Sequence, residues 1–251
     1  MFMATIKTSG IIIRKLNLGE ADKILTVLTR DRGKIRVLAK GVRRPKAKLS
    51  GFSDIFHYND FILAEGRNWD IVTSAVTIER FLRDDTALEQ IGLMYYVCEL
   101  TDKLIEETQT VLGSFELLRE TLAYMKNHPG STIARSYFEM KLLTLLGFAP
   151  QLNRCVVGGQ LFKDDEQLRF SCILGGVVSK AHSTADELAR PISVNALKWL
   201  RLLQRYPLEG IDKIKVDDDT IKQATSVLSD FVEYATEVKT KSLLVMGQLE
   251  D

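Results

Sequence analysis

The hydrophobic pattern of this 251-residue chain changes once, near Arg80, and this change constrains the fold more than any other feature. Before it, short runs rich in β-branched and aromatic residues alternate with turn residues, which is typical of strands. After it, apolar residues recur at helical spacing. We therefore predict an α+β fold, with a β domain over residues 1–80 and a helical domain over residues 81–251.

Five strand-like runs lie in the first 80 residues, at 11–15, 23–29, 34–40, 56–63 and 69–79. The tight turn Asp31-Arg32-Gly33 predicts that the second and third runs pair antiparallel, because Gly33 can adopt a positive φ. Five short strands with an irregular stretch after the third are the outline of an OB-fold barrel. An SH3-like barrel fits the same pattern.

Helical periodicity predicts five main helices, near residues 86–105, 111–125, 131–146, 194–206 and 219–237. Capping boxes at Thr86-x-x-Glu89 and Thr184-x-x-Glu187 predict helix starts at those two positions. Between the third and fourth helices, residues 151–182 are irregular and rich in glycine. The wide apolar stripes predict that the helices pack as a bundle.

Positive charge is concentrated between Arg30 and Lys48, where nine Lys or Arg face one Asp. The segment has a net charge of +8 while the whole chain has +1, so the rest carries −7. In the run 34–40 the cations alternate with apolar residues, which places them on one face of a strand. A solvated charged face is the plain alternative, but a cationic strand that leads into a basic loop favours a track for phosphates.

We predict that nine residues contact the phosphates of a nucleic acid. Arg14 and Arg32 are the weaker candidates, and the main ones are Lys34, Arg36, Lys40, Arg43, Arg44, Lys46 and Lys48. Phe52, Phe56, Tyr58 and Trp69 are aromatic residues that could stack on bases, although a core position is the more common role for such residues.

Several classes of function have no motif in this sequence. There is no Walker motif, dinucleotide-binding glycine motif, zinc-protease helix motif or nucleophile elbow, and the three histidines are widely separated, so we predict no catalytic residues and no cofactor. The three cysteines are too few and scattered for a disulfide framework, which favours a reducing compartment. Without a long apolar run or signal peptide, we expect a cytoplasmic protein without membrane contact.

Three segments resemble the bacterial recombination mediator family RecO. They are GEADKIL at residues 19–25, AKGVRRPK at 39–46 and LLTLLGFAP at 142–150, and they occur in the order of that family. The resemblance covers most of the chain and weakens beyond residue 190.

The resemblance implies a non-enzymatic mediator of DNA repair and recombination, associated with the nucleoid. It implies binding of single- and double-stranded DNA and annealing of complementary strands without ATP. It also implies work with the partner RecR, and that the two proteins together load the recombinase RecA, an indirect partner, onto DNA coated by single-strand-binding protein (SSB). We predict that Arg135, beside Tyr137 and Phe138, anchors the acidic, apolar tail of SSB, the alternative being an ordinary exposed helix arginine.

Many members of that family carry a four-cysteine zinc module, C-x-x-C-G followed by G-G-x-x-C-x-x-C. Here the corresponding positions hold Cys155, Gly158, Ser179 and His182, while Cys172 is out of register. Two ligand-type side chains fall short of the four that structural zinc takes. We predict a degenerate, metal-free relic of the module within residues 151–182, as an insertion in the helical domain.

Two other functions remain open on the residues alone. The first is an RNA-binding OB-fold module of translation or ribosome function, because a basic patch does not distinguish DNA from RNA. The second is a nuclease or another enzyme, which the missing ligand patterns disfavour.

Overall fold

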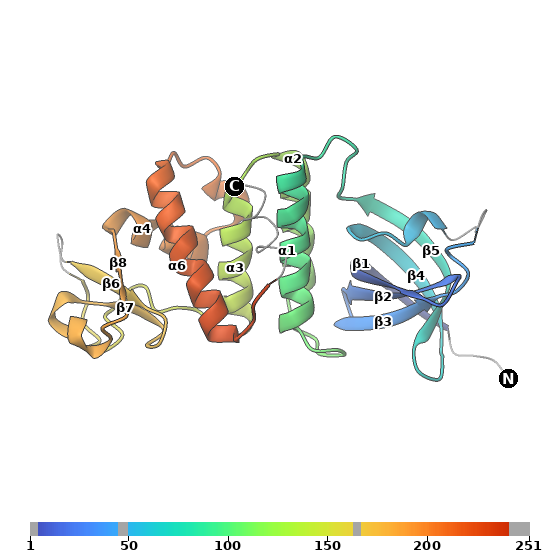
Figure 1. Ribbon diagram of the computed structural model, residues 1–251, viewed down its shortest axis with the longest axis horizontal. Coiled ribbons are helices and arrows are strands. Elements are labelled where there is room, and N and C mark those ends of the chain that lie inside the picture. The colour runs from blue at the N-terminus through green and yellow to red at the C-terminus, as the bar shows by residue number, and fades with distance from the viewer. Residues whose placement is uncertain (1–4, 45–49, 163–166, 241–251) are drawn as a thin grey trace. The chain divides into compact units, whose positions relative to one another are not determined.

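The structure, a computed structural model, describes residues 5–44, 50–162 and 167–240. Its internal contacts divide the chain into two compact units, one of residues 1–131 and one of residues 132–239 (Figure 1). The first unit contains the strands of the barrel and the first two helices. The predicted limit at residue 80 falls where strands give way to helices, and it remains a prediction for the domain boundary.

Five strands form a closed barrel in the order β1-β2-β3-β5-β4, which agrees with the predicted OB-fold barrel. The strands and the short 3₁₀ helix η1 that follows β3 are β1 Thr5–Leu18, β2 Asp22–Thr29, β3 Lys34–Ala39, η1 Ser50–Phe52, β4 His57–Ala64 and β5 Asp70–Arg80. As predicted, β2 and β3 pair antiparallel, and the turn at Gly33 has a φ of 66°. The α+β class is thereby confirmed.

The alternation predicted for the basic strand is also present. Val37 and Ala39 belong to the barrel core, together with Ile12, Leu25 and Val27. Since neighbouring residues of a strand point to opposite faces, burial of these residues turns the side chains between them outward. The barrel core thus fixes which cations of β3 face away from it.

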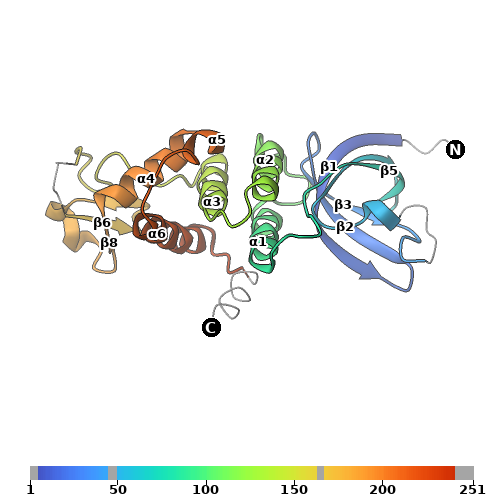
Figure 2. The same cartoon turned by 90° about the horizontal axis from the view of Figure 1, so that it is seen from above.

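Two helices complete the first unit, α1 Leu88–Leu104 and α2 Ser114–Asn127, and both pack against β1 (Figure 2). The capping box predicted at Thr86 is wrong. The Thr86 hydroxyl accepts a hydrogen bond from the Arg83 N–H at 3.1 Å, and α1 begins after Ala87, which gives no side-chain cap. The Thr86 hydroxyl is hydrogen-bonded within the preceding turn, so it does not cap the helix.

A buried ion pair joins the barrel to α1. The Lys34 ammonium lies 3.0 Å from a carboxylate oxygen of Asp102 and also donates to the Asp102 carbonyl. The side chains of Lys34 and Asp102 are 8% and 15% exposed. The second oxygen of the same carboxylate accepts from Arg14 at 3.1 Å. Asp102 therefore connects the start of β3 and the middle of β1 to one helix.

In the second unit, α3 Ile133–Leu145 packs against α4 Val194–Arg205 and α6 Asp218–Thr236, with the short α5 Leu208–Ile211 between the last two in sequence. A small sheet is formed by β6 Leu168–Ser171 and β7 Gly176–Val178 of the glycine-rich region together with β8 Arg190–Ile192, which follows it. The capping box predicted at Thr184 is wrong, because residues Lys180–Ala185 form the 3₁₀ helix η2. The following helix starts later, at Ser193, whose side chain accepts from the Ala196 N–H.

The four positions of the family's zinc module do meet in the second unit. Cys155 Sγ lies 3.6 Å from His182 Nδ1 and accepts a hydrogen bond from the Ser179 N–H at 3.4 Å. The Ser179 hydroxyl lies 3.2 Å from the same histidine nitrogen. Burial alone would raise the pKa of the Cys155 thiol, but hydrogen bonds from Ser179 and from backbone N–H groups lower it to about 6.

The residues at these positions do not fit zinc, because the side-chain amide of Gln160 fills the space beside Gly158 where a fourth ligand would lie. A Cβ on Gly158 would lie 2.1 Å from Gln160 Oε1 and 2.5 Å from His182 Cε1. The Gln160 amide nitrogen donates to the Ser179 hydroxyl at 3.0 Å and lies 3.3 Å from His182 Nδ1. Cys155, Gln160, Ser179 and His182 thus form a hydrogen-bonded cluster at the positions that the resemblance matches to zinc ligands.

We expect Lys34→Ala to lower the free energy of unfolding by about 2–3 kcal/mol, because removal of one partner leaves a buried carboxylate without its closest cation. Lys40→Ala, at the exposed cation directly after the same strand, should change it by less than about 0.5 kcal/mol. Urea denaturation followed by far-ultraviolet circular dichroism measures both. Equal effects of the two substitutions would contradict the structural role of Lys34.

We expect the purified protein to hold no stoichiometric zinc and to keep its Tm when a chelator is added. The triple variant Gly158→Cys, Gln160→Ala, Ser179→Cys restores four ligand-type side chains and clears the amide, so it should take up about one zinc per chain. Metal analysis and thermal denaturation with and without chelator distinguish the two proteins. One zinc per chain in the wild type would show that the cluster is a metal site after all.

Candidate nucleic-acid interface

The outer face of β1, β2 and β3 presents its side chains in rows across the strands. The pairing register places Arg14 and Arg36 on either side of Thr26, and it places Leu16 and Leu38 on either side of Ile24. Lys34 pairs with Leu28 in the row nearest α1. This face, called the β1–β2–β3 face below, therefore changes from a covered row to a cationic row and then to an apolar row.

The turn after β3 is held to the turn between β1 and β2. The Gly41 N–H donates to the Asp22 carboxylate at 2.8 Å, and the Arg43 N–H donates to the Ala21 carbonyl at 2.9 Å. The Arg43 guanidinium donates to the Gly19 carbonyl at 2.8 Å. Arg43 thus sits in an ordered turn, with exposed Lys40 and Arg44 beside it in sequence. We call the turns at residues 19–22 and 40–44 the barrel tip.

The structure distributes the predicted DNA-contacting residues unequally. Exposed Arg36, Lys40, Arg43 and Arg44 lie along β3 and on the barrel tip. Lys34 shares their face, but its ion pair with Asp102, 68 residues away in sequence, buries it against α1. Its side chain is therefore not exposed to a phosphate. The predicted contacts at Lys46 and Lys48 lie outside the described residues.

Arg14 and Arg32, the weaker candidates, have different positions. Arg14 is exposed in the cationic row, and its guanidinium pairs with Asp102 at 3.1 Å. Arg32 is exposed in the turn before β3, at the end of the hairpin opposite the barrel tip. A six-residue strand spans about 20 Å, so Arg32 and Lys40 do not belong to one cluster.

Two further cations near the barrel tip were not predicted from the sequence. Lys15 and Lys23 lie 2.7 and 3.7 Å from the Asp54 carboxylate, on the side of the β1–β2 hairpin that continues the barrel interior. Partial burial acts in the opposite direction, but Lys15 and Lys23 hold the pKa of Asp54 below its usual value. Burial and the nearby charge of Arg80 lower the pKa of His57, so this ring is neutral at pH 7.

The pairing register of the hairpin is the signal that could have identified Lys15 and Lys23. Lys15 pairs with Leu25 and Lys23 pairs with Ala39, both core residues. A lysine in register with core residues marks the point where the hairpin extends beyond the barrel. The hairpin therefore carries cations on both of its faces.

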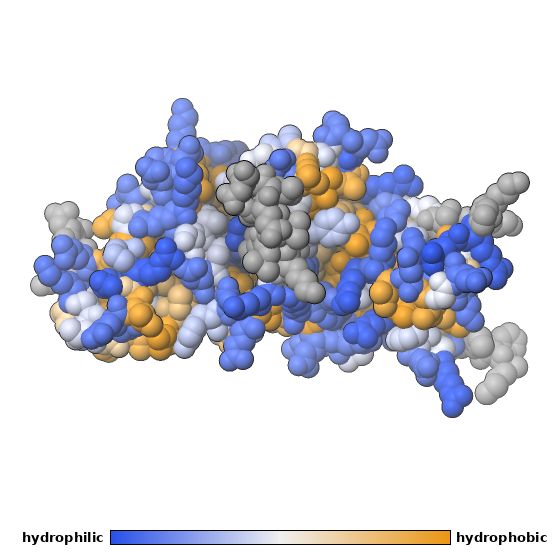
Figure 3. All heavy atoms as spheres, viewed as in Figure 1, coloured by the Kyte–Doolittle hydropathy of each residue, from blue (hydrophilic) through white to orange (hydrophobic). Residues whose placement is uncertain are grey.

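An exposed apolar strip lies between the cationic row and the barrel tip. Leu16 is 56% exposed and Leu18 is 38% exposed, and Ile24 and Leu38 are half-buried next to Leu16. In the space-filling view, hydrophobic surface over the barrel is bordered by hydrophilic side chains (Figure 3). The interface thus offers apolar contact as well as charge.

The aromatic residues give the barrel little stacking surface. Phe52 and Phe56 are buried, and Phe52 packs edge-on against Phe61 in the core. Tyr58 is half-buried and packs against Phe115 of α2. Trp69 is half-buried just before β5. Phe52 and Phe56 are therefore unavailable to bases.

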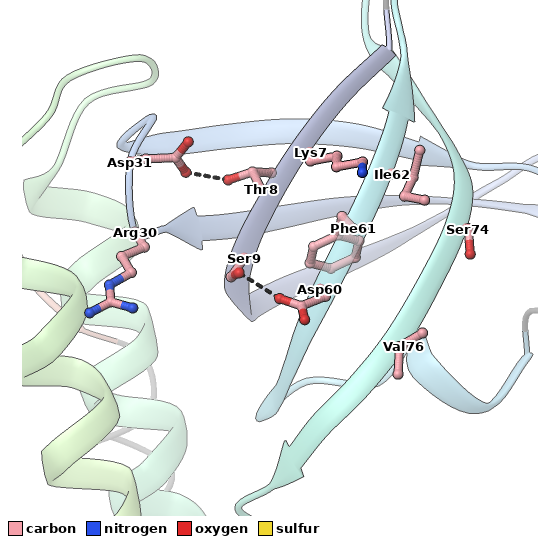
Figure 4. Close-up of a pocket in the computed structure, with 10 residues that line it drawn as sticks. All are labelled: Lys7, Thr8, Ser9, Arg30, Asp31, Asp60, Phe61, Ile62, Ser74 and Val76. Carbon is pink, nitrogen blue, oxygen red and sulfur yellow. Dashed lines mark hydrogen bonds between the residues drawn. The ribbon is translucent and has the colours of Figure 1, made fainter.

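A hollow of about 490 Å³ opens on the other side of the barrel, over β1, β4 and β5 (Figure 4). It contains the cations Lys7 and Arg30 and also the carboxylates of Asp31 and Asp60. Ser9 donates to Asp60 at 2.5 Å, and Thr8 donates to Asp31, as the dashed lines in Figure 4 show. Because its charges balance, this hollow is a poorer site for a polyanion than the β1–β2–β3 face.

Arg135 is engaged within the second unit. Its guanidinium lies 3.0 Å from the Glu139 carboxylate and donates to the Ser229 hydroxyl at 2.7 Å. Its side chain is only 18% exposed. Binding of a peptide carboxylate by Arg135 would require both internal bonds to break.

Within the described ranges, no group of three or more His, Cys, Asp or Glu is placed to hold a metal ion. None of the described helices combines the length and the apolar character needed to cross a bilayer.

Two family descriptions and a set of full-length relatives match the chain. Residues 3–81 match the family Recombination protein O N terminal, and residues 86–244 match Recombination protein O C terminal. The chain is similar to the DNA repair protein RecO of Roseiflexus sp. (strain RS-1), with 35% identity over 97% of this chain and 85% of that protein. The protein of the same name from Dehalococcoides mccartyi (strain 195) is 34% identical over 97% of this chain and 95% of its own length. The one from Desulforudis audaxviator is 32% identical over 98% of both. With both halves matched in order and over almost all of its length, the chain belongs to the RecO family.

Proposed function

We propose that this protein acts in DNA repair and recombination by binding the phosphate backbone of single- and double-stranded DNA and annealing complementary strands without ATP. The observation that carries the proposal is the concentration of exposed cations on the barrel tip and the β1–β2–β3 face of an OB-type barrel. Family membership supports the repair and recombination role. No step of the proposal makes or breaks a covalent bond, so the function is non-enzymatic.

The geometry suits backbone binding better than base recognition. Arg36 and Lys40 are held on or next to a paired strand, while Arg43 is held in a turn by its own backbone bond. Such cations position phosphates without reading a sequence. The adjacent leucines offer apolar contact to sugars and base edges, whereas the aromatic residues of the core do not reach the surface. Binding is therefore expected to be insensitive to sequence.

Annealing follows from neutralised repulsion between two strands. Each strand carries one negative charge per nucleotide, and cations on both faces of the β1–β2 hairpin lower the cost of bringing two strands together. Lys15 and Lys23 lie on one face and Arg14 on the other. A hairpin of this kind contacts one strand on each side.

The proposal includes the partners that family resemblance implies. RecR is the cooperating protein, SSB is bound through its acidic tail, and RecA is loaded indirectly. Arg135 is not carried into this proposal as the tail anchor, because Glu139 and Ser229 already engage it.

We expect wild-type protein to bind a single-stranded oligonucleotide with a slope of log K against log salt of about −4, which corresponds to about six neutralised phosphates. Arg43→Glu/Arg44→Glu should reduce the steepness by about 1.4, because two contacts are lost, and weaken binding by roughly tenfold or more at low salt. Fluorescence anisotropy at a series of salt concentrations measures both quantities.

Lys213→Glu/Lys215→Glu is the matched control, since it changes the net charge equally at exposed positions of the second unit. Acceleration of annealing of complementary strands, without nucleotide, should be lost with the first variant and kept with the second. A flat salt response, or equal weakening by both variants, would argue against the interface. Preference for RNA over DNA of the same sequence in a competition assay would favour a translation-related role instead.

A further inference from the structure

The cations of the interface differ in how far the protein itself already neutralises them. At the start of β3, Lys34 is buried with Asp102. Two residues later, Arg36 is 48% exposed and lies 3.3 Å from the Glu107 carboxylate. Beyond the end of β3, Lys40 and Arg44 have no ion partner among the described residues. Neutralisation therefore decreases along β3 from α1 toward the barrel tip.

The same arrangement recurs on either side of β3. Arg14 of β1 pairs with Asp102 at 3.1 Å, and Arg30, which follows β2, lies 3.5 Å from Glu116 of α2. All three carboxylates come from α1, α2 or the segment between them. Each of these three exposed arginines thus has an acidic partner from the helical part of the same unit.

The carboxylate of Glu107 is placed by the backbone, which distinguishes it from a chance surface pair. The Thr108 N–H donates to the Lys34 carbonyl at 2.8 Å, and Glu107 itself bridges to Lys34 as a parallel β-pair. Gly33 allows this approach, because a Cβ there would lie 2.2 Å from the Gln109 carbonyl oxygen. The segment 107–109 therefore runs along the start of β3 and holds its acid next to Arg36.

We propose that Asp102 and Glu107 compete with nucleic-acid phosphates for Arg14 and Arg36, and that they limit both the affinity and the length of the DNA contact. The inference rests on the DNA-binding function proposed above and deepens it. DNA first contacts the barrel tip, where Lys40 and Arg44 have no ion partner among the described residues. It extends to Arg36 and its neighbours only by displacing protein carboxylates.

The exposed pairs are weak enough for this exchange. Ion pairs at the protein surface contribute little and are screened by salt, while a strand of DNA presents many phosphates at once. The Lys34–Asp102 pair is buried and stays intact, so the exchange leaves the attachment of α1 unchanged. The contact with DNA thereby remains easy to release, which suits the transfer of a bound DNA strand.

The test uses the full chain and the isosteric substitution Glu107→Gln, with Asp102 retained because it holds Lys34. Freed Arg36 should neutralise one further phosphate, which steepens the salt slope by about 0.7. Affinity for a single-stranded oligonucleotide at low salt should rise about two- to fivefold, as one added phosphate contact implies. Fluorescence anisotropy over a salt series gives both values.

Two control proteins separate local competition from a general change of charge. Glu209→Gln removes one exposed carboxylate elsewhere and should leave the slope unchanged. Adding Arg36→Gln to Glu107→Gln should remove the gain that Glu107→Gln alone produces, because the freed arginine is then missing.

The outcomes distinguish this inference from the proposed function. If wild-type protein binds DNA with a salt dependence that Arg43→Glu/Arg44→Glu reduces, the proposed function stands. An affinity gain for Glu107→Gln no larger than that of the control, or an unchanged slope, would then overturn only the competition. If wild-type protein does not bind DNA at all, both fall together.

Discussion

The buried contact between Lys34 and Asp102 fixes the relation between the barrel and the first helix. Lys34 stands at the beginning of β3, and Asp102 stands near the end of α1, so one ion pair sets where the helix covers the sheet. Burial of this pair makes it sensitive to the loss of either partner, unlike pairs at the surface. The same carboxylate reaches Arg14 in the exposed row, so the structural contact and the candidate interface share a residue.

Along β3, the pairing of the barrel's cations with carboxylates decreases with distance from this contact. Next to α1 the cations are buried or paired, whereas at the barrel tip Lys40 and Arg44 are exposed. On the opposite side, the hollow between β1 and β4 contains acids as well as bases, and its hydroxyl groups are bonded to those acids. A polyanion is therefore directed to the barrel tip and the β1–β2–β3 face. The near-neutral charge of the whole chain conceals this asymmetry.

Local pattern was sufficient to predict the barrel but not the surroundings of its cations. The alternation of β3 correctly placed Val37 and Ala39 in the core and Arg36 outside, because strand periodicity is a local property. Burial of Lys34 depends on a helix 68 residues away, and Lys15 joins the interface only through the register of the β1–β2 hairpin. The positions that the resemblance matched to a zinc module show the same limit. The resemblance singled out Cys155 and His182, but the amide of Gln160 that lies beside them belongs to no motif.

The most direct test of the account is a lysine-acetylation footprint of the full chain, read by mass spectrometry with and without single-stranded DNA. Lys40 is exposed and should react in the free protein and be protected by DNA, as should Lys15, which is 37% exposed beside Asp54. Lys34 should be unreactive in both states because it is buried, and Lys7, in the hollow on the other side, should react equally in both. Protection of Lys7 without protection of Lys40 would contradict the assignment of the DNA-binding face.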